Sequence, residues 1–126
     1  VFYTRFINTI GGPFVKFLVY NAMSTEEEYE FVVDVVKGAT IFNKTGYGLS
    51  FEMINELKNR NIKEIEICGT DIDACILAVA FDLFDNGIRP IILENLCGTS
   101  SSNKEINKCA ITLIDRQFGK NNIKTV

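Results

Sequence analysis

The sequence contains no histidine, and its four cysteines form none of the close pairs that hold a zinc ion. Zinc sites in proteins combine cysteine, histidine and carboxylate ligands at short spacings. A metal site is therefore not expected, and no pattern in the sequence calls for a cofactor.

Basic residues and long apolar runs are also scarce. The 13 lysines and arginines are outnumbered by 16 aspartates and glutamates, for a formal net charge of -3, and no basic run is interleaved with aromatic residues. Nucleic acid is therefore not an expected partner. No apolar stretch approaches the roughly 20 residues that cross a bilayer, and Val1 does not open a signal-peptide pattern, so we expect a soluble protein with no membrane partner.

The composition is that of one compact domain. A length of 126 residues with 47% hydrophobic residues suffices for one sizeable core, so residues 1–126 are expected to form a single domain. The cysteines at positions 68, 75, 97 and 109 lie inside or beside apolar runs. This placement suits a reducing compartment better than a disulfide scaffold, and the cytoplasm is the predicted location.

Hydrophobic patterning predicts alternating strands and helices. Residues 1–6 are β-branched and aromatic, as in a strand. Ser24 and Glu27 match a capping box, and valines follow at helical spacing, which predicts a helix from Ser24 to about Lys37. The remaining predicted elements are a strand over residues 40–42, a helix over 50–60, a strand over 63–68, a helix over 74–86, a strand over 89–93, a helix over 103–118 and a final strand over 123–126.

Strict alternation of strands and helices predicts an α/β fold. Right-handed crossovers between the strands would give a three-layer α/β/α Rossmann-like sandwich with a mostly parallel sheet. Ligands of such sheets bind beyond the carboxyl ends of the strands. Functional residues are therefore expected where a strand runs into a helix.

Cys75 lies at one of these junctions. The strand over residues 63–68 turns at Gly69 into the helix whose first turn holds Cys75. Unpaired backbone N–H groups and the positive end of a helix favour a reactive thiolate, and they can stabilise an oxyanion when the sulfur attacks a carbonyl. From its position alone, Cys75 is either such a nucleophile or a small buried hydrophobic residue.

The segment from Ile67 to Ser100 resembles the signature of the isochorismatase-like cysteine hydrolases. It has their Gly-rich turn, an aspartate two residues before the cysteine, a glycine that ends the following helix and a closing strand. Residues 2–6, 41–47 and 110–119 are similar to the family's second strand, its lysine-bearing third strand and its terminal helix. The resemblance thus covers essentially the whole chain.

The resemblance implies which residues form the active site. Cys75 would be the nucleophile, and Lys44 would hold the thiolate and stabilise developing negative charge. The peptide between Thr70 and Asp71 would be cis, and the N–H groups of Asp71 and Cys75 would form the oxyanion hole. Considered without the family, Lys44 is a solvated loop lysine, and Thr70-Asp71 is an ordinary trans turn because a cis non-proline peptide costs about 3 kcal/mol.

Three other residues have secondary roles in this interpretation. Asp73, two residues before Cys75, is expected to cap the helix or to order the turn. Tyr47 and Phe51 are candidates to line the substrate pocket, and they could equally be core residues.

The sequence departs from the family pattern in one element. The family's Asp, Lys and Cys triad takes its aspartate from the end of the first strand, and Val1 already lies in what resembles the second strand. The family's first strand lies between its second and fourth strands, so its loss would leave backbone polar groups unpaired. We therefore expect an incomplete sequence, or a separate N-terminal segment that supplies the aspartate.

The predicted function is hydrolysis of a small amide or carbamoyl C–N bond. Cys75 favours such substrates over the vinyl ether that true isochorismatases cleave, and the lack of histidine disfavours a metal-dependent nicotinamidase. The alternative is an inert family member that serves as a subunit or a small-molecule binding module. A redox pair of Cys68 and Cys75 is disfavoured because the helix should point them apart. We also expect a homo-oligomer, from the family's habit and the aromatic segment 14–20.

Overall fold

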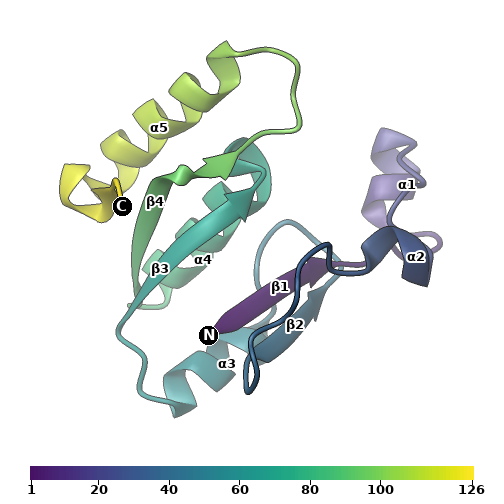
Figure 1. Cartoon of the computed structure of the whole chain (residues 1–126), viewed down its shortest axis with the longest axis horizontal. Coiled ribbons are helices and arrows are strands. Elements are labelled where there is room, and N and C mark those ends of the chain that lie inside the picture. Colours follow the sequence, from purple (N-terminus) through teal and green to yellow (C-terminus); the bar gives the residue numbers. More distant parts are fainter. The chain divides into compact units, whose positions relative to one another are not determined.

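The computed structural model describes residues 1–126 and divides into two compact units, Val1–Tyr47 and Gly48–Val126 (Figure 1). Both units combine helices with parallel strands, which confirms the α/β fold class. None of the helices is long and apolar enough to cross a membrane.

The first unit is built on two parallel strands, β1 (Phe2–Phe6) and β2 (Thr40–Lys44). Their register runs from Phe2 opposite Thr40 to Phe6 opposite Lys44, so the carboxyl end of both strands lies at Lys44. Across the pair, the rings of Phe2 and Phe42 stack with their centroids 5.5 Å apart. The pattern over residues 1–6 and 40–42 therefore predicted both strands, with β2 two residues longer than expected.

The helix predicted from Ser24 to Lys37 is wrong in its length. Helix α2 spans only Glu26–Tyr29, and its capping box is formed one residue later than predicted, by Thr25 and Glu28. The valines that suggested a longer helix bury no common face, since Val32, Val33 and Val36 are 99%, 60% and 54% exposed. β-Branched residues have low helix propensity, and without burial they do not extend the helix.

The connection between β1 and α2 also contains a helix that the sequence patterns did not predict. Helix α1 spans Pro13–Leu18 and begins with a proline at its first position, where the missing N–H costs nothing. No residue of α1 is buried. The helix therefore lacks the apolar core-facing stripe from which a periodic pattern would be recognised.

The second unit contains a three-stranded parallel sheet in the order β3-β4-β5. The most buried large side chains of this unit come from four helical segments and one strand. The helix predicted over residues 50–60 buries the expected face, which carries Met53, Ile54 and Leu57. The elements are α3 (Phe51–Asn59), β3 (Glu64–Thr70), a π-helical turn η1 (Ile72–Ile76), α4 (Leu77–Asp85), β4 (Arg89–Gly98), α5 (Glu105–Phe118), a 3-10 turn η2 (Lys120–Asn122) and β5 (Ile123–Lys124).

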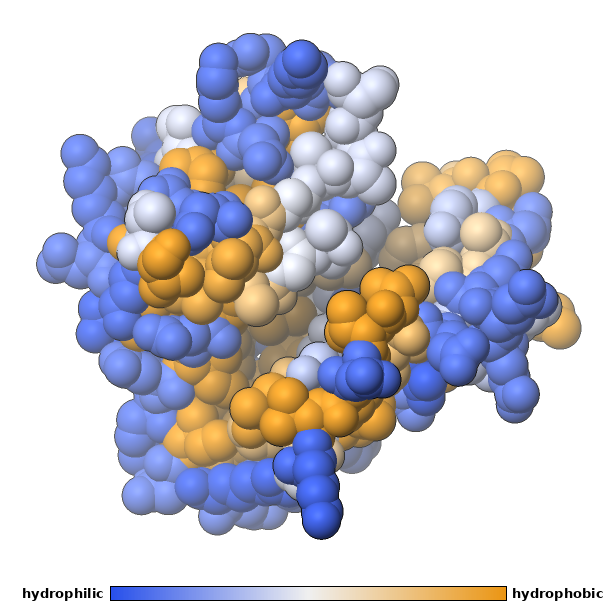
Figure 2. Space-filling view, in the orientation of Figure 1, coloured by the Kyte–Doolittle hydropathy of each residue, from blue (hydrophilic) through white to orange (hydrophobic).

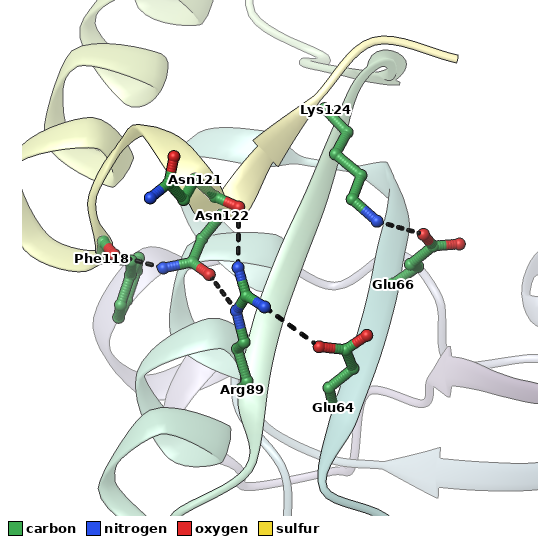
Figure 3. Close-up of polar contacts among 7 residues, drawn as sticks. All are labelled: Glu64, Glu66, Arg89, Phe118, Asn121, Asn122 and Lys124. Carbon is green, nitrogen blue, oxygen red and sulfur yellow. Dashed lines mark hydrogen bonds and ion pairs between the residues drawn. The ribbon is translucent and has the colours of Figure 1, made fainter.

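Polar contacts fix the amino ends of β3 and β4 and attach β5 to them (Figure 3). The guanidinium of Arg89, the first residue of β4, pairs with Glu64 at 3.2 Å and donates to the Asn122 side chain at 2.6 Å. Lys124 on β5 pairs with Glu66 on β3 at 3.0 Å. Such exposed pairs contribute little stability each. The opposite, carboxyl ends of β3 and β4 are left for the Thr70-to-Cys75 turn.

The strands of each unit pair only with strands of the same unit. The strands form a two-stranded sheet and a three-stranded sheet, where the sequence patterns predicted one sheet. Periodicity within a strand cannot predict which strands pair into one sheet, because it records which face is buried and not which strand lies alongside.

Candidate active site

Cys75 lies in the turn that connects β3 to α4. Strand β3 ends at Thr70, the peptide bond between Thr70 and Asp71 is cis, and the π-helical turn η1 follows from Ile72. Gly69 has φ +128°, a backbone conformation that residues with a side chain rarely adopt. The predicted α-helix over residues 74–86 is therefore wrong at its start, because Cys75 lies in a π-turn that precedes the α-helix.

One carbonyl group organises this turn. The carbonyl oxygen of Asp71 accepts hydrogen bonds from the N–H groups of Ala74 at 3.1 Å and Ile76 at 3.0 Å, the residues on either side of Cys75. The N–H of Cys75 donates to no backbone acceptor outside its own helical turn. The N–H of Cys75 thus does not share the Asp71 carbonyl with the N–H groups of its two neighbours.

The side chain of Asp71 connects the turn to the segment after β4. Its carboxylate accepts the N–H of Ser100 at 2.9 Å and the hydroxyl of Ser100 at 2.5 Å. Asp73, in contrast, is exposed, and neither η1 nor α4 has a side-chain cap. The capping role expected of Asp73 is therefore wrong.

Sequence reasoning missed Ser100. The available signal was the Ser100-Ser101-Ser102 run, but the predicted strand ended at residue 93, five residues short of the end of β4, and a contact between residues 29 positions apart has no periodic signature. The pairing of β3 with β4 creates the contact, because Thr70 lies opposite Gly98 and Ser100 follows two residues later.

Lys44 is the last residue of β2 and is only 5% exposed. Its ammonium donates to the carbonyl oxygens of Gly46 at 3.0 Å and Tyr47 at 2.6 Å. The interpretation of Lys44 as a solvated loop lysine is therefore wrong. Because an ammonium has three N–H donors, two carbonyl contacts leave one donor for a further acceptor.

The two aromatic candidates are both exposed. Tyr47 is 45% exposed and packs its ring against Phe14, with the centroids 4.8 Å apart. Phe51, the first residue of α3, is 76% exposed. A core role is thus wrong for both residues, and their pocket role stays a prediction. Of the predicted site residues, Lys44 is hydrogen-bonded to Tyr47 in the first unit, and Thr70, Asp71 and Cys75 lie in one turn of the second unit.

The other cysteines differ from one another in environment. All four cysteines are free, and Cys68 and Cys109 are exposed. Burial raises the pKa of the Cys97 thiol, the N–H of Gly69 partly opposes that increase, and nearby Cys68 adds to it. Cys97 is therefore held in the thiol form at neutral pH.

Solved structures with the same fold include several amidases. An isochorismatase-like hydrolase from Alkaliphilus metalliredigens aligns over 98% of this chain and 68% of its own, with TM-score 0.85 and 14% identity. The pyrazinamidase of Pyrococcus horikoshii, solved in complex with zinc, aligns over 99% and 73%, with TM-score 0.81 and 20% identity. The N-carbamoylsarcosine amidase from Thermoplasma acidophilum aligns over 99% and 71%, with TM-score 0.80 and 18% identity. At these identities the likeness shows the fold.

The zinc bound by the Pyrococcus protein has no matching ligand set in this chain. The sequence has no histidine, and no group of three or more cysteine, aspartate or glutamate side chains is placed to hold a metal ion. No chemical step is therefore assigned to a metal.

Family membership follows from the sequence itself. Curated protein sequences give no match, but a family model described as "Isochorismatase domain" matches residues 1–120. That match covers nearly the whole chain, including β2 with Lys44 and the Thr70-to-Cys75 turn. The chain belongs to the isochorismatase family of hydrolases.

Proposed function

We propose that the chain hydrolyses the C–N bond of a small amide or carbamoyl compound, with the Cys75 thiolate as nucleophile. The observation that carries this proposal is the turn around Cys75, in which the neighbouring N–H groups converge on the Asp71 carbonyl while the N–H of Cys75 does not. A backbone N–H directed at a site beside a sulfur nucleophile is the arrangement that stabilises an oxyanion. The names of related amidases support an amide substrate.

The proposed reaction has two stages. The Cys75 sulfur bonds to the substrate carbonyl carbon, and the carbonyl electrons move to the oxygen, which accepts hydrogen bonds from the N–H groups of Asp71 and Cys75. Collapse of this intermediate breaks the C–N bond, the leaving nitrogen takes up the proton that the Cys75 thiol gave up, and the amine or ammonia departs from a thioester. Water then attacks the thioester, releases the acid and returns the thiol. The proposal assigns no general base among the 126 residues.

Lys44 takes the role of the catalytic lysine in this proposal. The family pattern gives the assignment, and the burial of Lys44 supports it, because a buried ammonium held by two carbonyls keeps one donor for an anion. Its positive charge would favour the thiolate and later the oxyanion.

Alkylation of the cysteines separates this function from an inert binding module. An activated Cys75 should react with iodoacetamide at neutral pH faster than Cys109, which is exposed, and faster than Cys97, whose thiol pKa is raised by burial. Lys44→Met should slow Cys75 and leave Cys109 unchanged. If Cys75 reacts no faster than Cys109, the nucleophile proposal fails.

Turnover is tested with ammonia release from nicotinamide, pyrazinamide and N-carbamoylsarcosine as probes. Cys75→Ser should reduce any activity by about 10³-fold or more, because a serine hydroxyl lacks the thiolate's reactivity. Cys109→Ser is the matched control and should retain full activity.

We also propose that the protein works as a homo-oligomer in the cytoplasm. Apolar side chains gather at the surface around α1, in orange at the right of Figure 2, and Phe17, Leu18 and Val19 are 80%, 59% and 78% exposed. A contiguous exposed apolar patch is typical of an interaction surface. Four free cysteines suit a reducing compartment.

A further inference from the structure

We propose that Ser100 is a positioning residue for the oxyanion hole and acts through the carboxylate of Asp71. This inference rests on the proposed function, because it concerns the N–H of Asp71 as an oxyanion donor. Ser100 itself would touch neither the substrate nor the sulfur.

Asp71 is held by all of its polar groups except that N–H. Its carbonyl oxygen accepts from Ala74 and Ile76, and both of its carboxylate oxygens accept from Ser100. The two bonds from Ser100 come from one residue, so they fix the direction of the carboxylate as well as its position. Because this N–H belongs to the residue whose carboxylate Ser100 holds, its direction depends on Ser100 as well.

The segment that carries Ser100 is itself braced. The N–H of Ser101 donates to the Thr99 hydroxyl at 3.2 Å, and the N–H of Asn103 donates to the Ser101 hydroxyl at 3.1 Å. The N–H of Glu105, the first residue of α5, then donates to the Asn103 side chain at 3.0 Å. These local bonds run from the end of β4 to the start of α5 and hold the segment in a defined shape.

The pair also holds the negative charge of Asp71 in a fixed place. A carboxylate in the loop before a cysteine nucleophile would repel a thiolate and an oxyanion if it turned toward them. Because the N–H and the hydroxyl of Ser100 bind both oxygens, the carboxylate is directed to the segment after β4. Ser100 thus orients the donor of Asp71 and restrains its charge.

The test compares two reactions of Cys75 that differ in their need for an oxyanion hole. Alkylation by iodoacetamide needs the thiolate but forms no oxyanion. A small aldehyde such as propanal is captured reversibly: the sulfur–carbon bond forms, the carbonyl π bond breaks, and the thiol proton ends on the carbonyl oxygen. The aldehyde Kd is measured on the full chain as protection of Cys75 against iodoacetamide, followed by mass spectrometry.

Ser100→Ala should raise the aldehyde Kd about tenfold or more and leave the alkylation rate of Cys75 within about twofold, since a misplaced oxyanion donor affects only the tetrahedral adduct. Ser100→Thr keeps the hydroxyl and should restore the Kd to within about twofold of the original protein. Ser102→Ala, a neighbouring serine that does not contact Asp71, is the matched control and should change neither quantity.

Three outcomes overturn the inference. An unchanged aldehyde Kd in Ser100→Ala shows that Ser100 positions no oxyanion donor, and so does a lack of protection of the original protein by propanal. In either case, fast alkylation of Cys75 would still support Cys75 as the nucleophile. Equal effects of Ser100→Ala on both reactions show a merely structural role. If Ser100→Ala does not fold, Asp71→Ala, which removes the same two hydrogen bonds and keeps the backbone N–H, replaces it, and the same selective rise of the aldehyde Kd is required. Slow alkylation of Cys75 in the original protein defeats the proposed function as well.

Discussion

The carboxylate of Asp82 on α4 accepts the backbone N–H of Leu49 at 2.7 Å and lies where a Cβ atom on residue 48 would be. Gly48→Ala would force this carboxylate aside and break its bond to Leu49. We expect a loss of about 1–3 kcal/mol in the free energy of unfolding. Chemical denaturation measures it.

Gly46→Ala is the matched control, because a Cβ there meets nothing within 4 Å. In an Asp82→Ala background the overlap is absent, so Gly48→Ala should then cost less than half as much. Additive costs in this double-mutant cycle would contradict the assigned contact.

Lys44→Met should destabilise the first unit. The substitution removes the donor from the carbonyls of Gly46 and Tyr47, and we expect a cost of about 1–3 kcal/mol. Lys16→Met, at an exposed position of α1, is the control and should stay within about 0.5 kcal/mol. Equal effects of the two substitutions in thermal unfolding would show that the buried ammonium adds no stability.

Cys97 should alkylate more slowly than an ordinary exposed thiol, and its rate should rise at higher pH. Burial raises its pKa, so its thiolate fraction increases only when the pH approaches that raised pKa. Mass spectrometry of iodoacetamide-treated protein across pH 6–10 gives the rate of each cysteine, with urea-unfolded protein as the reference. A Cys97 profile that does not change on unfolding would contradict the assignment.

Glu28 should titrate below an ordinary glutamate. Hydrogen bonds from the backbone N–H groups of Ser24, which has the larger effect, and of Thr25 lower its pKa. A lowered pKa in the folded state means that the capping contribution to stability is present above the unfolded-state pKa and is lost as the pH falls through the folded-state pKa. NMR titration of the side-chain carboxyl measures this pKa, and the lowering should vanish in urea, where the capping hydrogen bonds are lost. A folded-state pKa at or above the ordinary value would contradict the cap.

Phe17→Ser should weaken self-association. Aromatic side chains at the centre of an interface commonly contribute more than 1 kcal/mol, so the dissociation constant should rise about tenfold. Light scattering after size-exclusion chromatography measures the oligomeric state, with Lys16→Ser as the control on the same helix. A monomer at all concentrations for the unsubstituted chain would defeat the homo-oligomer proposal.

The sequence by itself determined the elements that bury a regular face. The helix with Met53, Ile54 and Leu57 was predicted because it encodes its burial in a local period of about 3.6 residues. The strand at residues 1–6 was predicted from its β-branched and aromatic residues. The strand-to-helix junction at Cys75 was predicted, but not the π-helical turn that forms it. The resemblance to the isochorismatase family was readable for the same reason, since its motif is contiguous.

Only the tertiary structure decided features that depend on a neighbour distant in the sequence. The valines after Tyr29 had helical spacing but buried no common face, so α2 ended early. Lys44, a charged residue next to a predicted turn, was read from the sequence as a solvated loop residue. Its burial depends on the turn that follows β2, whose carbonyl groups accept its ammonium. The contact of Asp71 with Ser100 required the register of β3 against β4. A hydrogen bond between segments 29 residues apart leaves no trace in local periodicity, because it depends on strand pairing that is specified by the whole unit.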